Sequence, residues 1–194
     1  FAILRVLNKL NKGEAEGARC VYMAPTPEIA KERLNDWQSR MGDALGVRVV
    51  ALTGETAADL KLLERGQVVI ATPHQWDVIS RRWKQRKNVQ NVALFIADEL
   101  HLIGGAVGPT MEVVTSRMRY ISSQLDKPIR VVGLCTSLAN AKDLGEWLGA
   151  GSHGMFNFPP GVRPVPLDIH VQGVDIVNFE SRMQAMARPV YSAI

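Results

Sequence analysis

Short apolar runs alternate along this chain with longer segments in which apolar residues recur at helical spacing. The short runs are rich in valine, isoleucine and leucine, a composition that favours buried strands. We expect strands at residues 18–24, 47–52, 67–71, 92–97 and 130–134, and helices at residues 28–44, 57–65, 75–83, 110–122 and 141–148. This alternation predicts an α/β fold, a doubly wound and mainly parallel sheet with helices on both faces.

The two ends of the chain depart from this regular pattern. Residues 1–10 have helical spacing without a capping residue before them, so we expect the sequence to begin inside a helix. Near the other end, residues 165–171 alternate like an edge strand and residues 178–187 have the pattern of a closing helix. We expect a single compact unit, with residues 159–194 as a terminal extension of it.

Composition sets broad limits on the class of protein. The chain has 194 residues, of which 46% are hydrophobic, enough to bury one core. No apolar stretch approaches the roughly 20 residues that span a bilayer, and no leader is evident, so neither membrane insertion nor secretion is expected. Cys20 and Cys135 lie in strand-like runs, which predicts buried thiols in a reducing, intracellular compartment. The net charge of +4 permits contact with nucleic acid without requiring it.

Two adjacent carboxylates, Asp98 and Glu99, directly follow the apolar run at residues 92–97. Ligands collect outside the carboxyl ends of parallel strands, and paired acids there suit ATP with Mg²⁺. We expect Asp98 to hold magnesium, through water, and Glu99 to orient or deprotonate the water that attacks the γ-phosphate. His101 follows closely enough to relay between nucleotide and nucleic acid, although it could simply cap a turn.

Three polar or proline-containing turns follow other predicted strands. Thr72 and Pro73 have the residue types of an N-cap and a first helical position, and free N–H groups at such a helix start suit a nucleic-acid phosphate. Similar turns occur at Pro25-Thr26 and at Thr53-Gly54. We predict nucleic-acid binding at these six residues, with plain capped helices as the alternative.

Two further features bear on this chemistry. Cys135, Thr136 and Ser137 follow the fifth predicted strand, where small polar side chains could couple the acidic motif to nucleic acid, although a simple turn fits them equally well. The run at residues 81–87 contains five basic residues and one tryptophan. It fits a solvated or protein-binding face better than an RNA contact, because it lies at the far end of the helix that starts at Pro73.

These motifs together resemble the DExH-box helicases of superfamily two, which have RecA-like domains. Asp98 to His101 resemble the nucleotide-hydrolysis motif of that family, and the three turns resemble its nucleic-acid motifs, in the same order. Cys135, Thr136 and Ser137 stand where the family has its Ser-Ala-Thr coupling motif. The resemblance implies a first RecA-like helicase domain over residues 1–194, whose terminal extension leads toward a second such domain.

Further segments, including residues 80–91, 116–124 and 162–167, resemble the carboxyl-terminal cassette of the large RNA helicases of the spliceosomal U5 snRNP. This resemblance implies an ATP-dependent nuclear RNA helicase that works in mRNA splicing. Its implied partners are RNA, the neighbouring helicase cassette, the second RecA-like domain and spliceosomal proteins. In such proteins the first cassette drives unwinding and the second serves mainly as a regulator.

Several departures from the family pattern limit what the chain can do. It contains no Gly-Lys dipeptide, so the phosphate loop G-x-x-x-x-G-K-[ST] is absent, and we expect a piece that begins just after that loop and turns over no ATP alone. Cys135 replaces a serine, Ala139 a proline and His74 an acid found in the family. The alternative is therefore a catalytically weak pseudohelicase that serves as a protein-binding platform. A DNA helicase or translocase would share the general motifs.

Overall fold

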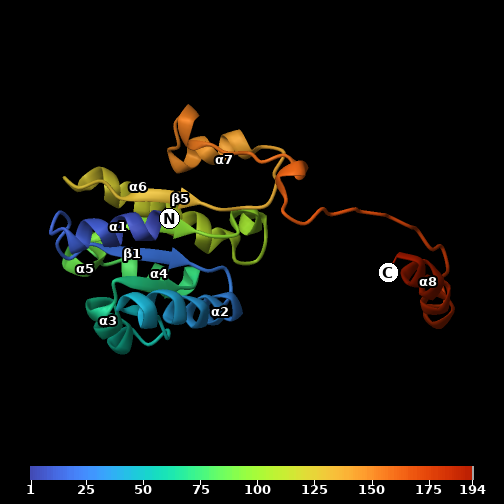
Figure 1. Ribbon diagram of the computed structural model, residues 1–194, viewed down its shortest axis with the longest axis horizontal. Helices are drawn as coiled ribbons and strands as arrows, with labels where there is room; N and C mark the ends of the chain where they lie inside the picture. Colours follow the sequence, from blue (N-terminus) through green and yellow to red (C-terminus); the bar gives the residue numbers. More distant parts are fainter. Residues whose placement is uncertain (194) are drawn as a thin grey trace. The chain divides into compact units, whose positions relative to one another are not determined.

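All five predicted strands pair in one parallel sheet in a computed structural model of the protein, which describes residues 1–193 (Figure 1). The strand order is β2-β3-β1-β4-β5, and each neighbouring pair is parallel. The strands are β1 Arg19–Met23, β2 Val49–Ala51, β3 Val68–Ala71, β4 Val92–Ala97 and β5 Arg130–Gly133. The predicted α/β class is confirmed.

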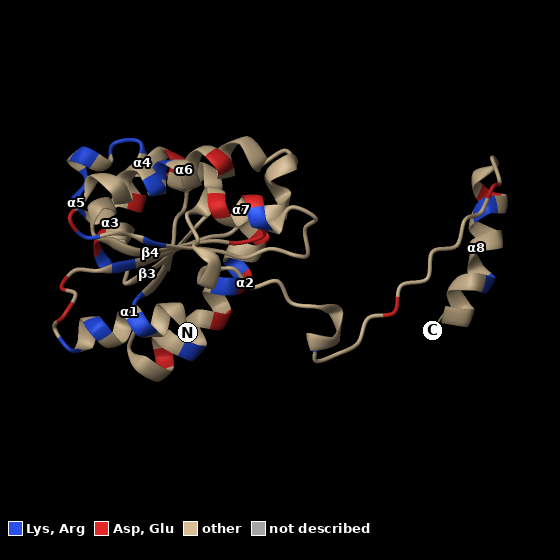
Figure 2. Ribbon diagram, turned by 90° about the horizontal axis from the view of Figure 1, so that it is seen from above, with Lys and Arg blue, Asp and Glu red and all other residues tan. Residues whose placement is uncertain are grey.

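Helices cover both faces of the sheet (Figure 2). Their bounds are α1 Ala2–Asn11, α2 Pro27–Trp37, α3 Thr56–Arg65, α4 Pro73–Ser80, α5 Lys87–Gln90, α6 Gly108–Gln124 and α7 Ala141–Leu148. Because side chains alternate along a strand, β1 directs Cys20 and Tyr22 into the core under α1 and α2. Val21 and Met23 enter the core under the other helices, where Trp76 and Met118 are also buried. The central strands are therefore apolar on both faces.

Two helices end earlier than their hydrophobic spacing predicts. The helix expected over residues 28–44 ends as α2 at Trp37 and continues as a π-helical segment, Gln38–Asp43. The helix expected over residues 75–83 begins at Pro73 and ends at Ser80, followed by the 3₁₀ turn Trp83–Gln85. Arg86 donates hydrogen bonds to the carbonyl oxygens of Val78 and Ile79, which satisfies acceptors that a longer helix would use.

The chain divides into two units, Phe1–Asn157 and the residues from Phe158 onward, so the expectation of a single compact unit is wrong. The second unit contains the 3₁₀ turn Pro160–Val162, an extended segment and helix α8, Phe179–Ala193. The edge strand predicted at residues 165–171 does not form in the described structure. Pro166 lacks the N–H group that a strand ladder needs, and Val165 and Val171 are 72% and 92% exposed.

The two cysteines have opposite environments. Cys20 is buried in β1, and burial raises the pKa of its thiol to about 12. Cys135 is exposed, so the prediction of a second buried thiol is wrong. The reason is that β5 ends at Gly133, and Cys135 already belongs to the loop beyond it. None of the helices within residues 1–193 combines the length and apolar character needed to cross a membrane.

Candidate functional site

The strands end in register along one edge of the sheet, here called the carboxyl edge. Met23 pairs with both Ala71 and Ala97, and Ala97 pairs with Gly133. Each of these residues is the last of its strand. The segments predicted to bind ligands follow directly, at Pro25-Thr26, Thr53-Gly54, Thr72-Pro73, Asp98-Glu99 and residues 135–137. The structure thus places all the predicted site segments at one edge.

The carboxylate of Asp98 is held from two sides. Its Oδ1 accepts a hydrogen bond from the Glu99 backbone N–H at 2.9 Å, and its Oδ2 accepts one from the Tyr22 hydroxyl. Tyr22 is only 3% exposed, and burial together with the adjacent carboxylate raises the pKa of its phenol. Sequence reasoning missed Tyr22, because its side chain looks like an ordinary core aromatic in an apolar strand.

Glu99 links the acidic motif to the loop after β5. Its φ of 53° is the left-handed conformation, and it is the one positive-φ residue other than glycine within residues 1–193. The turn brings Glu99 Oε2 to 3.3 Å from His101 Nε2. The Thr136 N–H donates to His101 Nδ1 at 3.4 Å, so a neutral ring carries its proton on Nε2, toward Glu99. The predicted hydrolysis and coupling segments therefore touch through His101.

The rest of the coupling segment is exposed. The Cys135 residue is exposed overall, but partial desolvation of its thiol and the nearby Glu99 carboxylate raise the pKa of that thiol. Ser137 is also exposed, and no hydrogen bond of its side chain is present in the described structure. Thr136 is thus the member of this segment that contacts the acidic motif.

The turn at Thr53 and Gly54 is organised by a carboxylate that sequence reasoning missed. Asp59 Oδ1 accepts hydrogen bonds from the Thr53 N–H at 2.6 Å and from the Thr53 hydroxyl at 2.9 Å. Asp59 Oδ2 accepts one from the Gly54 N–H at 3.0 Å. Asp59 is 2% exposed and lies in the first turn of α3. An acid five or six residues beyond a Thr-Gly turn is the signal that could have revealed this contact.

The helix start at Thr72 and Pro73 is a closed capping box. The Gln75 side chain accepts from the Thr72 N–H at 2.8 Å and donates to the Leu52 carbonyl at 3.1 Å, while the Thr72 hydroxyl accepts from the Gln75 N–H. The expectation of free N–H groups here is wrong for Thr72 and Gln75. At the equivalent start of α2, the Thr26 hydroxyl accepts from the Ile29 N–H. Contacts to a polynucleotide would have to come from the outer surface of these turns.

The basic run at residues 81–87 follows the carboxyl-terminal end of α4, the helix end opposite Thr72 and Pro73. Arg81 is paired with Asp77 of its own helix, and Arg117 of α6 binds the same carboxylate at 2.8 Å. Burial by itself raises the pKa of Asp77, but the hydrogen bonds and charges of Arg81 and Arg117 together outweigh it, so the pKa is lowered. Arg86 is held by helix carbonyls. This part of the structure is therefore mainly a support for α4 and α6.

No cluster of three or more acidic, histidine or cysteine side chains able to hold a metal occurs within the described residues. A magnesium ion needs no such cage, since it binds through one or two carboxylates, several waters and substrate phosphates. A single fixed carboxylate, as at Asp98, fits that requirement.

Comparison with known proteins identifies the family of proteins that this chain matches. Residues 1–144 match the DEAD/DEAH box helicases. The chain belongs to the DEAD/DEAH box helicase family. The resemblance to DExH-box helicases that the motifs indicated is thereby confirmed.

Relatives that match over the whole chain include a plant helicase and a human helicase. It is 66% identical to the DExH-box ATP-dependent RNA helicase DExH12 of Arabidopsis thaliana and 54% identical to the U5 small nuclear ribonucleoprotein 200 kDa helicase of Homo sapiens, in each case over 194 residues. The chain spans 9% of the length of either relative.

Solved structures show the same fold. The DEAD-box helicase Mss116, in a structure with single-stranded RNA and UDP-BeF, is 18% identical and superposes with a TM-score of 0.61. The similarity covers 75% of this chain and 30% of that one. The RecA-like fold predicted from the motifs is therefore confirmed.

Proposed function

We propose that this chain is the first RecA-like domain of an ATP-dependent RNA helicase cassette, contributing half of an ATP site and part of an RNA track. The observation that carries the proposal is the fixed carboxylate of Asp98 at the carboxyl edge, beside the Glu99, His101 and Thr136 contacts. The turns proposed to bind RNA leave the same edge. Family membership and the names of the relatives support this assignment.

In the proposed ATP half-site, Asp98 holds magnesium through water and Glu99 accepts a proton from the attacking water. Magnesium supplies charge stabilisation at the phosphates when it is bound. The position of helix α1 is consistent with a nucleotide at this edge, since Figure 1 shows that the helix starts on the side to which the strand arrows point. Its first turn contains no acidic residue, which suits a phosphate at that helix end.

In the proposed RNA track, Pro25, Thr26, Thr53, Gly54, Thr72 and Pro73 face the polynucleotide along the carboxyl edge. The capping contacts of Gln75 and Asp59 hold two of these turns rigid, which favours a defined path for the phosphates. His101 then connects the two ligands, because Thr136 and Glu99 bind opposite sides of its ring.

The relatives suggest the setting of this activity. We propose that the whole protein is a nuclear helicase of the spliceosome, and that the chain belongs to its carboxyl-terminal cassette. The extension from residue 159 would lead to a second RecA-like domain, and the neighbouring cassette and spliceosomal proteins would be its partners. The 54% sequence identity with the human U5 helicase, which extends over all 194 residues, supports this setting.

The deciding experiment is to replace Glu99 with glutamine in the complete protein, with its other cassette inactivated, and to measure RNA-stimulated ATP hydrolysis. We expect turnover to fall by a factor of about 100 or more with little change in nucleotide affinity, since the change removes a proton acceptor. The exposed carboxylate Glu180, changed in the same way, serves as the control.

Two results would contradict parts of the proposal. Vigorous RNA-stimulated hydrolysis by the 194 residues alone would show that they hold more than half a site. Tight ATP binding by the intact cassette without any hydrolysis would favour the pseudohelicase platform, for which the exposed Cys135 in the coupling segment is the structural support.

A further inference from the structure

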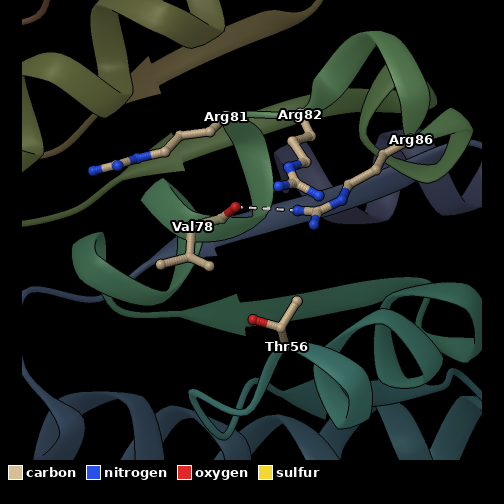
Figure 3. A pocket seen from close by; sticks show the side chains of 5 residues that line it. All are labelled: Thr56, Val78, Arg81, Arg82 and Arg86. Carbon is tan, nitrogen blue, oxygen red and sulfur yellow. Dashed lines mark hydrogen bonds between the residues drawn. The ribbon is translucent and has the colours of Figure 1, made fainter.

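A cavity of about 300 Å³ lies away from the nucleotide site, between the start of α3 and the second half of α4 (Figure 3). It is lined by Thr56, Val78, Arg81, Arg82 and Arg86. Three of the five lining residues are arginines, and none is acidic. The cavity therefore has the composition of an anion site.

Two of these arginines lack a carboxylate partner. Arg81 is paired with Asp77, whereas Arg86 donates only to the carbonyl oxygens of Val78 and Ile79. Within the part of the chain that the structure describes, the side chain of Arg82 makes no hydrogen bond or ion pair. Figure 3 shows the guanidinium groups of Arg82 and Arg86 side by side. Burial, and to a smaller extent the charge of Arg82, lowers the pKa of Arg86. Two like charges held together in this way favour an anion between them.

The opposite wall of the cavity also suits an anion. Thr56 is the first residue of α3, and its hydroxyl is a hydrogen-bond donor. The residue before it, Glu55, makes no side-chain hydrogen bond to the helix start, and the Asp59 carboxylate in the same first turn is occupied by Thr53 and Gly54. The carbonyl contacts of Arg86 hold its planar group in place before a ligand arrives.

We propose that this cavity binds the phosphate of a phosphorylated serine or threonine in a protein partner. A phosphomonoester carries about −1.5 to −2 charges at neutral pH, which matches two guanidinium groups without a carboxylate partner, whereas an RNA phosphodiester or a carboxylate carries one. Arginine also binds phosphate with two parallel hydrogen bonds.

The surroundings argue against RNA as the occupant. Stacking of single-stranded RNA bases needs aromatic platforms beside the cations, and no aromatic residue lines the cavity. The nearby Trp83 packs edge-on against Tyr120, with ring centroids 6.4 Å apart, and Lys84 lies over its ring. Its faces are therefore poorly placed to stack on a base. The proposal does not depend on the ATP half-site.

The test is a titration of the full 194-residue chain, followed through the arginine Nε–H signals in ¹⁵N NMR spectra. The probes are a short glycine–alanine peptide with one phosphoserine, the same peptide without phosphate, and a short oligouridylate. We expect the phosphopeptide to shift the Arg82 and Arg86 signals and the unphosphorylated peptide to leave them unchanged. Arg82→Gln should weaken phosphopeptide binding about tenfold or more.

The matched control is Lys87→Gln, which removes the same charge from an exposed residue outside the cavity. It should change the affinity less than about twofold. Equal losses in both variants would show a diffuse charge effect and overturn the proposal. If oligouridylate shifted these signals and the phosphopeptide did not, the cavity would be assigned to RNA and the proposal would be overturned. Absence of any shift with phosphopeptide would mean that the two arginines are simply solvated.

Discussion

The Tyr22 hydroxyl donates a hydrogen bond to Asp98 across the boundary between β1 and β4. Tyr22 pairs in register with Ile96, two residues before Asp98, so its side chain reaches along the sheet toward the carboxyl edge. Its ring is in turn held by an edge-on contact with Trp37 of α2, with centroids 4.9 Å apart. A buried aromatic residue thus fixes the orientation of the carboxylate that we propose holds magnesium.

Replacing Tyr22 with phenylalanine should loosen this carboxylate while keeping the ring packing. In the complete protein, we expect the Mg²⁺ concentration for half-maximal ATP hydrolysis to rise about tenfold, the equivalent of about 1.4 kcal/mol. The measurement is steady-state turnover against Mg²⁺ concentration. Tyr120→Phe, which removes an exposed hydroxyl, is the control. An unchanged Mg²⁺ dependence in Tyr22→Phe would mean that Tyr22 has no part in positioning Asp98.

Replacing His101 with alanine should separate RNA binding from hydrolysis, because this ring connects Glu99 to the Thr136 backbone. We expect RNA stimulation of turnover in the complete protein to fall about tenfold or more, with a smaller change in hydrolysis without RNA. Turnover with and without RNA provides the measurement, and the exposed His153 changed to alanine provides the comparison. An equal fall in both rates would make His101 part of hydrolysis itself.

Replacing Asp59 with alanine should destabilise the fold through the turn at Thr53 and Gly54. Three hydrogen bonds to a buried carboxylate are lost, and the Gly54 N–H is left without its partner. We expect the free energy of unfolding to fall by about 3 kcal/mol. Urea denaturation measures this value, and Asp126→Ala, at an exposed turn, should change it by less than about 0.5 kcal/mol. A loss as small as that of the control would exclude a structural role for Asp59.

The buried pairing of Asp77 with Arg81 and Arg117 should make stability depend on pH. Since the pKa of Asp77 is lowered on folding, its contribution is present above about pH 4, the ordinary pKa of an aspartate, and is lost as the pH falls toward the folded value. We expect Asp77→Asn to cost about 2 kcal/mol at neutral pH. This difference from the unmodified chain should shrink in acid, as followed by urea denaturation at several pH values.

A matched control for Asp77 is Asp36 of α2, which pairs at 2.7 Å with Arg40 of the following π-helical segment, four residues along the chain as in the Asp77–Arg81 pair. The Asp36 side chain is 34% exposed, compared with 7% for Asp77, so this pair contributes less and Asp36→Asn should cost less than about 1 kcal/mol. If both substitutions showed the same loss and the same pH dependence, burial of Asp77 would not be the cause.

Much of the fold could be predicted because the signals are local. The apolar run at residues 92–97 predicted β4 with its observed bounds, and the proline after Thr72 predicted the start of α4. The edge strand at residues 165–171 was predicted wrongly because alternation alone does not provide a neighbouring strand with which to pair. Cys135 was misplaced because the end of β5 depends on where its pairing with β4 stops.

The sequence by itself determined that acids and polar turns follow buried parallel strands, and hence that they share one edge, because strand patterns and connection rules act over short distances. Only the tertiary structure decided which side chains hold these acids and turns in place. Tyr22 and Asp98 are 76 positions apart, and Arg117 and Asp77 are 40 apart. Such contacts depend on strand register and helix packing, which no local pattern specifies, and they determine how firmly each predicted site residue is positioned.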